Sequence, residues 1–71
     1  MMKNYVFNEL KGKEQGEMII VKAATADEAC EKAKMKEKIK PCERFKTMYF
    51  SKTYQLYELG KPFAVDYICH R

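Results

Sequence analysis

The sequence predicts a small α+β domain: an antiparallel sheet in the order β-β-α-β-β-β, with one helix packed on one face. Three observations lead to this fold class. Short aromatic and β-branched segments recur along the chain, turn residues separate them in pairs, and one central segment carries helix start and stop signals. The chain has 71 residues, 46% of them hydrophobic and 34% charged, so we expect residues 1–71 to form a single domain.

The first two strands are expected in the amino-terminal third of the chain. Residues 4–10, "NYVFNEL", are short, aromatic and β-branched, as strands are. Residues 11–17 contain two glycines and no apolar side chain, so we expect a hairpin loop there. The return strand is predicted at residues 18–23, and its nearly continuous apolar run favours a central position in the sheet.

The central segment has a lysine at every second position from 32 to 40, a spacing that a strand with one basic face would also show. Its composition favours a helix, because alanine, lysine, methionine and glutamate predominate. Thr25 followed by Glu28 is a capping box, acidic residues precede the lysines, and Pro41 is a stop signal. We therefore expect a helix at about residues 26–38.

Small side chains share one face of this helix, at about 100° per residue. They are Ala26, Ala29, Cys30 and Ala33. The narrow stripe predicts a close approach of helix to sheet. Lysines border it on both sides: Lys32, Lys34, Lys36 and Lys38. With Lys40 and Arg44, these lysines are expected to gather positive charge at the carboxyl end of the helix.

Three further strands are predicted after Pro41, at residues 45–50, 54–59 and 63–69. The connections at 51–53 and 60–62 are short enough for hairpin turns, which gives a meandering sheet. The face opposite the helix is expected to be open, with some of five aromatic side chains exposed there: Tyr5, Phe7, Tyr49, Tyr54 and Tyr57.

Catalysis, metal binding and a cofactor are not expected. The single histidine, His70, is next to Cys69 in a predicted strand, where neighbouring side chains point to opposite faces. Cys30, Cys42 and Cys69 contain no pair two to four residues apart, the usual spacing of structural zinc ligands. An odd number of cysteines also argues against a secreted disulfide framework, so we expect reduced thiols.

The sequence shows no membrane segment and no signal peptide, since no apolar run approaches about 18 residues. We expect a cytoplasmic protein without membrane association. Fourteen Lys and Arg against ten Asp and Glu give a net charge of +4, which permits an acidic partner without requiring one.

Two groups of side chains are candidates for binding a partner. The basic group is either a solvated helix end or a contact for phosphates or an acidic protein surface. Exposed tyrosines would add an aromatic contact. The candidate partner-binding residues are Lys34, Lys36, Lys38, Lys40, Arg44 and Tyr49.

Three segments resemble the small phage-encoded anti-CRISPR proteins, in particular a type I-F inhibitor of about this length. They are the strand-to-helix passage "IIVKAATADEACEKAK", the cysteine and aromatic in "PCERF", and the closing strands "YQLYELGKPFAVDY". The resemblance covers nearly the whole chain in element order. It implies a non-enzymatic inhibitor that binds a crRNA-guided surveillance complex in the host cytoplasm and blocks target DNA binding by steric occlusion. The implied contact region is 34–44, including Cys42. Charge mimicry of DNA is excluded, because this chain is basic.

Three hypotheses therefore remain open. The first is an anti-CRISPR protein whose partner is the host CRISPR effector complex, with weak affinity for nucleic acid allowed. The second is a small nucleic-acid-binding module that uses the basic helix end. The third is a homodimer formed through the aromatic face of the sheet.

Overall fold

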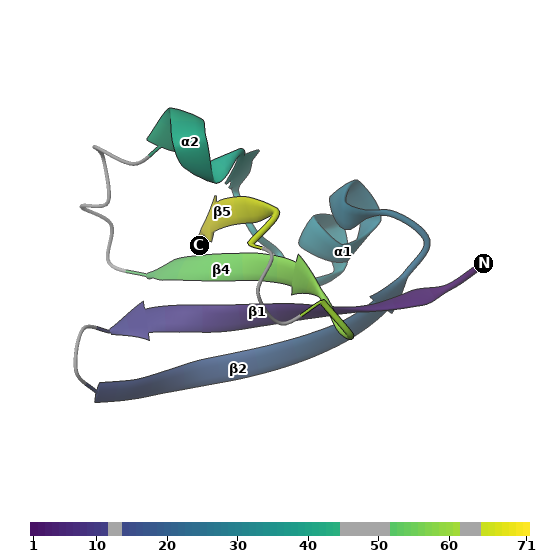
Figure 1. Ribbon diagram of the computed structural model, residues 1–71, viewed down its shortest axis with the longest axis horizontal. Helices are drawn as coiled ribbons and strands as arrows, with labels where there is room; N and C mark the ends of the chain where they lie inside the picture. Colours follow the sequence, from purple (N-terminus) through teal and green to yellow (C-terminus); the bar gives the residue numbers. More distant parts are fainter. Residues whose placement is uncertain (12–13, 45–51, 62–64) are drawn as a thin grey trace.

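The computed structural model describes residues 1–11, 14–44, 52–61 and 65–71, with side chains for all of these except Gln15, Glu43 and Arg44 (Figure 1). Within these residues, five strands form one antiparallel sheet. The elements are β1 (Lys3–Lys11), β2 (Glu14–Ala23), α1 (Ala26–Lys32), β3 (Glu37–Ile39), α2 (Pro41–Arg44), β4 (Thr53–Glu58) and β5 (Tyr67–His70). The predicted α+β class, with an antiparallel sheet and a helix after the first hairpin, is confirmed.

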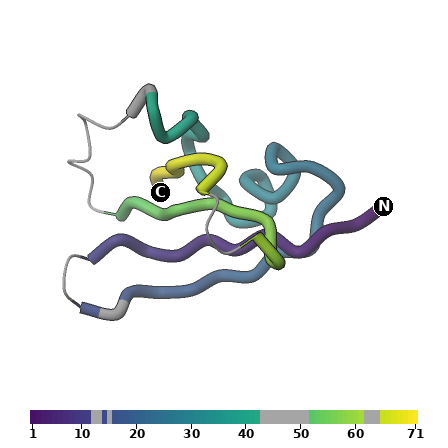
Figure 2. The backbone as a smooth tube through the Cα atoms, viewed as in Figure 1, coloured from purple at the N-terminus to yellow at the C-terminus, as the bar shows by residue number. Residues whose placement is uncertain are grey.

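The strand order is β2-β1-β4-β5-β3, which differs from the expected meander. β1 lies between β2 and β4, and β3 pairs with β5 at the far edge. Figure 2 shows the amino terminus beside α1 and the carboxyl terminus between α2 and β4. The strand predicted at 45–50 lies outside the described residues; the third strand that the structure shows is the short β3.

The first hairpin is tighter than predicted, because β2 begins at Glu14 instead of residue 18. Lys11 pairs with Glu14, and the register shifts between Asn8 and Leu10. At this bulge, a Cβ on Gly16 would lie 2.7 Å from the backbone oxygen of Glu9. Gly16 therefore permits a close backbone approach inside a strand, a role that glycine has at bulges as well as in loops.

The start of α1 confirms the capping box. Thr25 has extended backbone angles, and its hydroxyl oxygen accepts a hydrogen bond from the Glu28 N–H. The Glu28 carboxylate in turn accepts from the Ala24 N–H at 2.8 Å. This hydrogen bond is the main reason why the pKa of Glu28 lies below its ordinary value.

The predicted end of the helix at residue 38 is wrong. Lys34 adopts φ 60°, and the N–H groups of Lys34 and Met35 donate to the carbonyls of Glu31 and Cys30. These two hydrogen bonds form a Schellman motif, which ends a helix and normally uses glycine at the left-handed position. Met35 packs against the core, and the chain then enters β3. Of the alternating lysines, Lys38 therefore lies on a strand, with Lys36 directly before β3 and Lys40 directly after it.

The core lies between α1 and one face of the sheet. Its buried members are Tyr5, Phe7, Ala23, Ala29, Cys30, Ala33, Tyr54, Leu56 and Cys69. The predicted alanine and cysteine stripe of the helix is thus confirmed. Of the five aromatic residues among which some exposure was expected, Tyr5, Phe7 and Tyr54 are buried. They are 7%, 0% and 0% exposed, because they occupy the helix-covered face. Tyr57 is half-buried on the opposite face, and Tyr49 lies outside the described residues.

β2 is an edge strand, so the predicted central position is also wrong. Ile19 and Val21 pack against the core, whereas Met18 and Ile20 point to the other face and are 57% and 58% exposed. That second face is not open throughout, because Val6 in β1 is buried. The apolar run that favoured a central strand therefore includes two exposed side chains.

Tyr54 and Arg71 both contact Glu17, and Arg71 also contacts the carboxyl end of α1. Its hydroxyl donates to Glu17 Oε1 at 2.8 Å, and burial together with this carboxylate raises the pKa of Tyr54 to about 12. Arg71 lies 3.4 Å from the same carboxylate oxygen and donates to the Ala33 carbonyl oxygen at 3.0 Å. The polar contacts of Tyr54, Glu17 and Arg71 thus close the core at the carboxyl end of α1.

Two of the three thiols face each other in the core. The Sγ atoms of Cys30 and Cys69 are 3.6 Å apart, and both residues are buried, whereas Cys42 is exposed. Their hydrogen bond lowers the pKa of Cys30 and raises that of Cys69, because the proton stays on Cys69 and stabilises a Cys30 thiolate.

The burial of these thiols predicts unequal reactivity. In the native protein a maleimide should label Cys42 rapidly, and Cys30 and Cys69 on the order of a hundredfold more slowly, because labelling them requires local opening. Mass spectrometry of peptides after timed labelling measures this ratio, and labelling in denaturant is the control. Equal rates at Cys30 and Cys42 in buffer would contradict the packing of α1.

Candidate functional site

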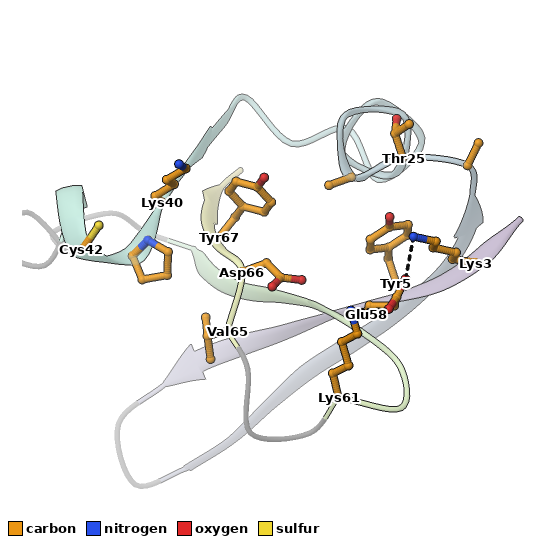
Figure 3. A pocket seen from close by; sticks show the side chains of 13 residues that line it. Lys3, Tyr5, Thr25, Lys40, Cys42, Glu58, Lys61, Val65, Asp66 and Tyr67 are labelled. Atoms are coloured by element: carbon orange, nitrogen blue, oxygen red, sulfur yellow. Dashed lines mark ion pairs between the residues drawn. The ribbon is translucent and has the colours of Figure 1, made fainter. Parts of the chain in front are cut away.

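A groove of about 720 Å³ opens beside the start of α1, where β1 begins and β4 ends (Figure 3). Tyr5 and Glu58 are opposite each other on these two strands and form part of the wall. The other lining residues come from four separate segments: Lys3, Ala24, Thr25, Ala26, Lys40, Pro41, Cys42, Lys61, Val65, Asp66 and Tyr67. The groove therefore exists only when β1, α1, the β3–α2 segment and the β4–β5 connection come together.

Glu58 forms ion pairs with two lysines at one end of the groove. Its two carboxylate oxygens lie 3.2 Å from Lys3 Nζ and 3.1 Å from Lys61 Nζ. The hydrogen bonds with Lys61 and Lys3 lower the pKa of Glu58, and the bond to Glu58 raises the pKa of Lys3. Both pKa shifts favour the charged forms of Glu58 and Lys3.

Tyr67 forms the wall near β3. Lys38 Nζ lies 4.0 Å from the centroid of its ring, a cation–π contact, and 2.6 Å from Asp27 Oδ1 on α1. The hydrogen bond to Asp27 is the largest cause of the raised pKa of Lys38. Lys38 therefore connects β3, β5 and α1, and its ammonium group is already engaged within the fold.

In the structure, the predicted site lysines do not lie together on one helix but are distributed from the end of α1 to the groove. Lys34 and Lys36 are exposed near the carboxyl end of the helix, where the Lys36 N–H donates to the His70 carbonyl oxygen. Lys38 lies on β3, and Lys40 is exposed at the groove. Because α1 ends at Lys32, these side chains follow the β3 edge instead of forming one cluster at a helix end.

The side chains of two predicted site residues cannot be placed relative to the groove. Arg44 belongs to α2 but its side chain is not described, and Tyr49 lies outside the described residues. Sequence reasoning also missed most of the groove, including Lys3, Glu58 and Tyr67. No local pattern marks these residues, because they meet only through the pairing of β1 with β4 and of β4 with β5.

The groove combines aromatic and aliphatic surface with separated charges. Three lysines against two carboxylates, Glu58 and Asp66, leave one net positive charge along its wall. The hydroxyl groups of Tyr5, Thr25 and Tyr67 add hydrogen-bonding groups at the same site. A surface of this kind can hold side chains of a protein partner, the acidic ones near Lys40.

Comparison with protein-family models, with curated proteins and with solved structures finds no match to this chain. Within the part of the chain that the structure describes, three or more potential metal ligands do not come together. None of the helices described is long and apolar enough to cross a membrane.

Proposed function

We propose that this protein is a non-enzymatic inhibitor that binds a CRISPR surveillance complex through the groove beside α1 and blocks target DNA binding by steric occlusion. The choice of partner rests on the resemblance of the element order to a type I-F anti-CRISPR protein. The choice of surface rests on the groove itself, which has the volume of a binding site and a wall of mixed apolar and polar groups.

The single observation that carries the proposal is the position of Lys40 at this groove. Of the lysines that the sequence placed in the partner surface, Lys38 is engaged with Asp27 and Tyr67, whereas Lys40 is exposed beside an aromatic wall. An interface needs an apolar centre with charges at its margin, and the groove offers both within one surface. Lys36 and Lys34 extend the positive margin along the β3 edge.

A bulky side chain in the groove tests the proposal. Val65 lines the groove and is 37% exposed, so Val65→Trp should occupy the space without disturbing the core. We expect inhibition of target DNA binding by a purified type I-F surveillance complex to weaken at least about tenfold, since a misfit at an interface centre costs about 2 kcal/mol or more. Leu59→Trp is the matched control, because Leu59 is 53% exposed in the same connection and does not line the groove. Equal loss or equal retention of inhibition in the two variants would contradict the proposed surface.

Charge reversal separates the two binding hypotheses. Lys40→Glu should weaken inhibition, whereas Lys11→Glu, on the exposed end of the first hairpin, should leave it nearly unchanged. A nucleic-acid-binding module would behave differently: the wild-type chain would bind duplex DNA directly, with an affinity that falls steeply with salt. That result, together with no binding to the surveillance complex, would favour the second hypothesis over the first.

A further inference from the structure

Two buried thiols lie close enough to be joined by a small movement. The Sγ atoms of Cys30 on α1 and Cys69 on β5 are 3.6 Å apart, although the two residues are 39 positions apart in the sequence. A disulfide holds its sulfur atoms at about 2.0 Å, so these two atoms have to approach by about 1.6 Å to form one. Cys42 is exposed at the groove and does not belong to this pair.

The packing of α1 permits such a movement. The helix is seven residues long and rests on the core through Ala26, Ala29 and Cys30, with Ala33 directly after it. Its remaining side chains are charged and lie outside the core cluster. Packed helices slide by small displacements, and methyl groups resist sliding less than long interlocked side chains do. A shift of α1, with rotation about the two Cα–Cβ bonds, therefore brings the sulfur atoms together.

The two thiols differ in access and in charge. Cys30 is 8% exposed, whereas Cys69 is 0% exposed. The hydrogen bond from Cys69 lowers the pKa of Cys30, and the positive charge of Lys38 also lowers it, although burial opposes both effects. The thiolate is the form of cysteine that reacts with oxidants. Cys30 is therefore the thiol that an oxidant reaches first, and Cys69 lies beside it to react next.

We propose that Cys30 and Cys69 form a peroxide-sensitive switch, in which a disulfide between them fastens α1 to β5. Hydrogen peroxide is the oxidant, because it is small enough to reach a thiol with so little exposure. The Cys30 thiolate attacks one peroxide oxygen, the O–O bond breaks, and the hydroxide takes a proton from solvent and leaves as water. Cys69 then attacks the sulfur of the Cys30 sulfenic acid, the S–O bond breaks, and the hydroxide leaves with the Cys69 proton as a second water. The two thiols lose two electrons, and one peroxide is reduced to two waters.

The bond links two walls of the groove. Thr25, the N-cap of α1, and Tyr67, the first residue of β5, both line it (Figure 3). In the reduced chain Lys38 connects these elements through Asp27 and Tyr67, and the disulfide adds a covalent link. Disulfides in reducing compartments are usually transient and redox-sensing, which agrees with a reversible switch. The switch does not depend on which partner occupies the groove.

Peroxide treatment of a Cys42→Ser variant tests the bond, because only the buried pair of thiols remains in it. After stoichiometric peroxide, peptide mapping without reduction should find the peptides of Cys30 and Cys69 joined in the native chain. The bond closes a loop of about 40 residues, so the midpoint of thermal unfolding should rise by about 10 °C or more. Dithiothreitol should reverse the rise, whereas it does not reverse oxidation of methionine. Oxidation of Cys30 to a sulfinic acid without a cross-link, or a cross-link that forms in urea and not in buffer, would overturn the proposal.

Two further variants test the order of attack. Cys69→Ser and Cys30→Ser, each in the Cys42→Ser background, leave one buried thiol and keep a hydrogen-bond donor beside it. Far-ultraviolet circular dichroism establishes that both are folded. Dimedone, which traps sulfenic acids, should label Cys30 in the first variant at least about tenfold faster than Cys69 in the second. Equal rates, or faster labelling of Cys69, would overturn the assignment of Cys30 as the attacking thiol.

Discussion

Replacing Tyr54 with alanine is expected to unfold most of the protein at room temperature. The Tyr54 ring is 0% exposed and lies in the core between the sheet and α1. Loss of a large buried aromatic side chain costs about 3–5 kcal/mol. A single core in a chain of this size rarely supplies more than about 3–5 kcal/mol in total. Urea denaturation followed by circular dichroism measures the loss.

Tyr54→Phe is the control for the hydroxyl group. It keeps the ring and removes only the hydrogen bond to Glu17, whose carboxylate stays beside Arg71. We expect a cost of about 1 kcal/mol. If Tyr54→Ala were as stable as Tyr54→Phe, the ring would not be part of the core.

Gly16→Ala should destabilise the protein by about 1–3 kcal/mol, the usual cost of forcing an extra methyl group into filled space. The new Cβ would lie 2.7 Å from both the Cβ and the backbone oxygen of Glu9. Because one of these atoms belongs to the backbone of β1, which is paired on both sides, a side-chain rotation does not relieve the contact. The midpoint of urea unfolding measures the effect.

Gly60 supplies the comparison, because it is constrained for a different reason. It has φ +102°, and among the described residues no atom lies within 4 Å of an added Cβ, so alanine there is strained by its backbone conformation. Asparagine tolerates positive φ better than alanine. Gly60→Asn should therefore recover part of the stability lost in Gly60→Ala, whereas Gly16→Asn should be no better than Gly16→Ala. Recovery at position 16 would show that crowding is not the cause.

The sequence allowed one residue of the candidate site to be selected, but it did not show which residues would lie around it. Lys40 was selected from the sequence as a basic residue, and it lies at the groove. The placement of Lys40 with Lys34 and Lys36 at one end of a helix was wrong, because α1 ends at Lys32. Lys3, Glu58 and Tyr67 could not be foreseen, since each is far from Lys40 along the chain and arrives there through strand pairing.

The sequence by itself determined the features that arise from neighbours along the chain. The capping box of Thr25 and Glu28, the small stripe of α1 and the two strands of the first hairpin all depend on residues a few positions apart. Tertiary structure alone decided where α1 ends, which strand occupies the centre of the sheet, and which residues line the groove. The reason is visible at Lys34: a lysine at positive φ costs conformational energy, and pairing of β3 with β5 and packing of Met35 offset it.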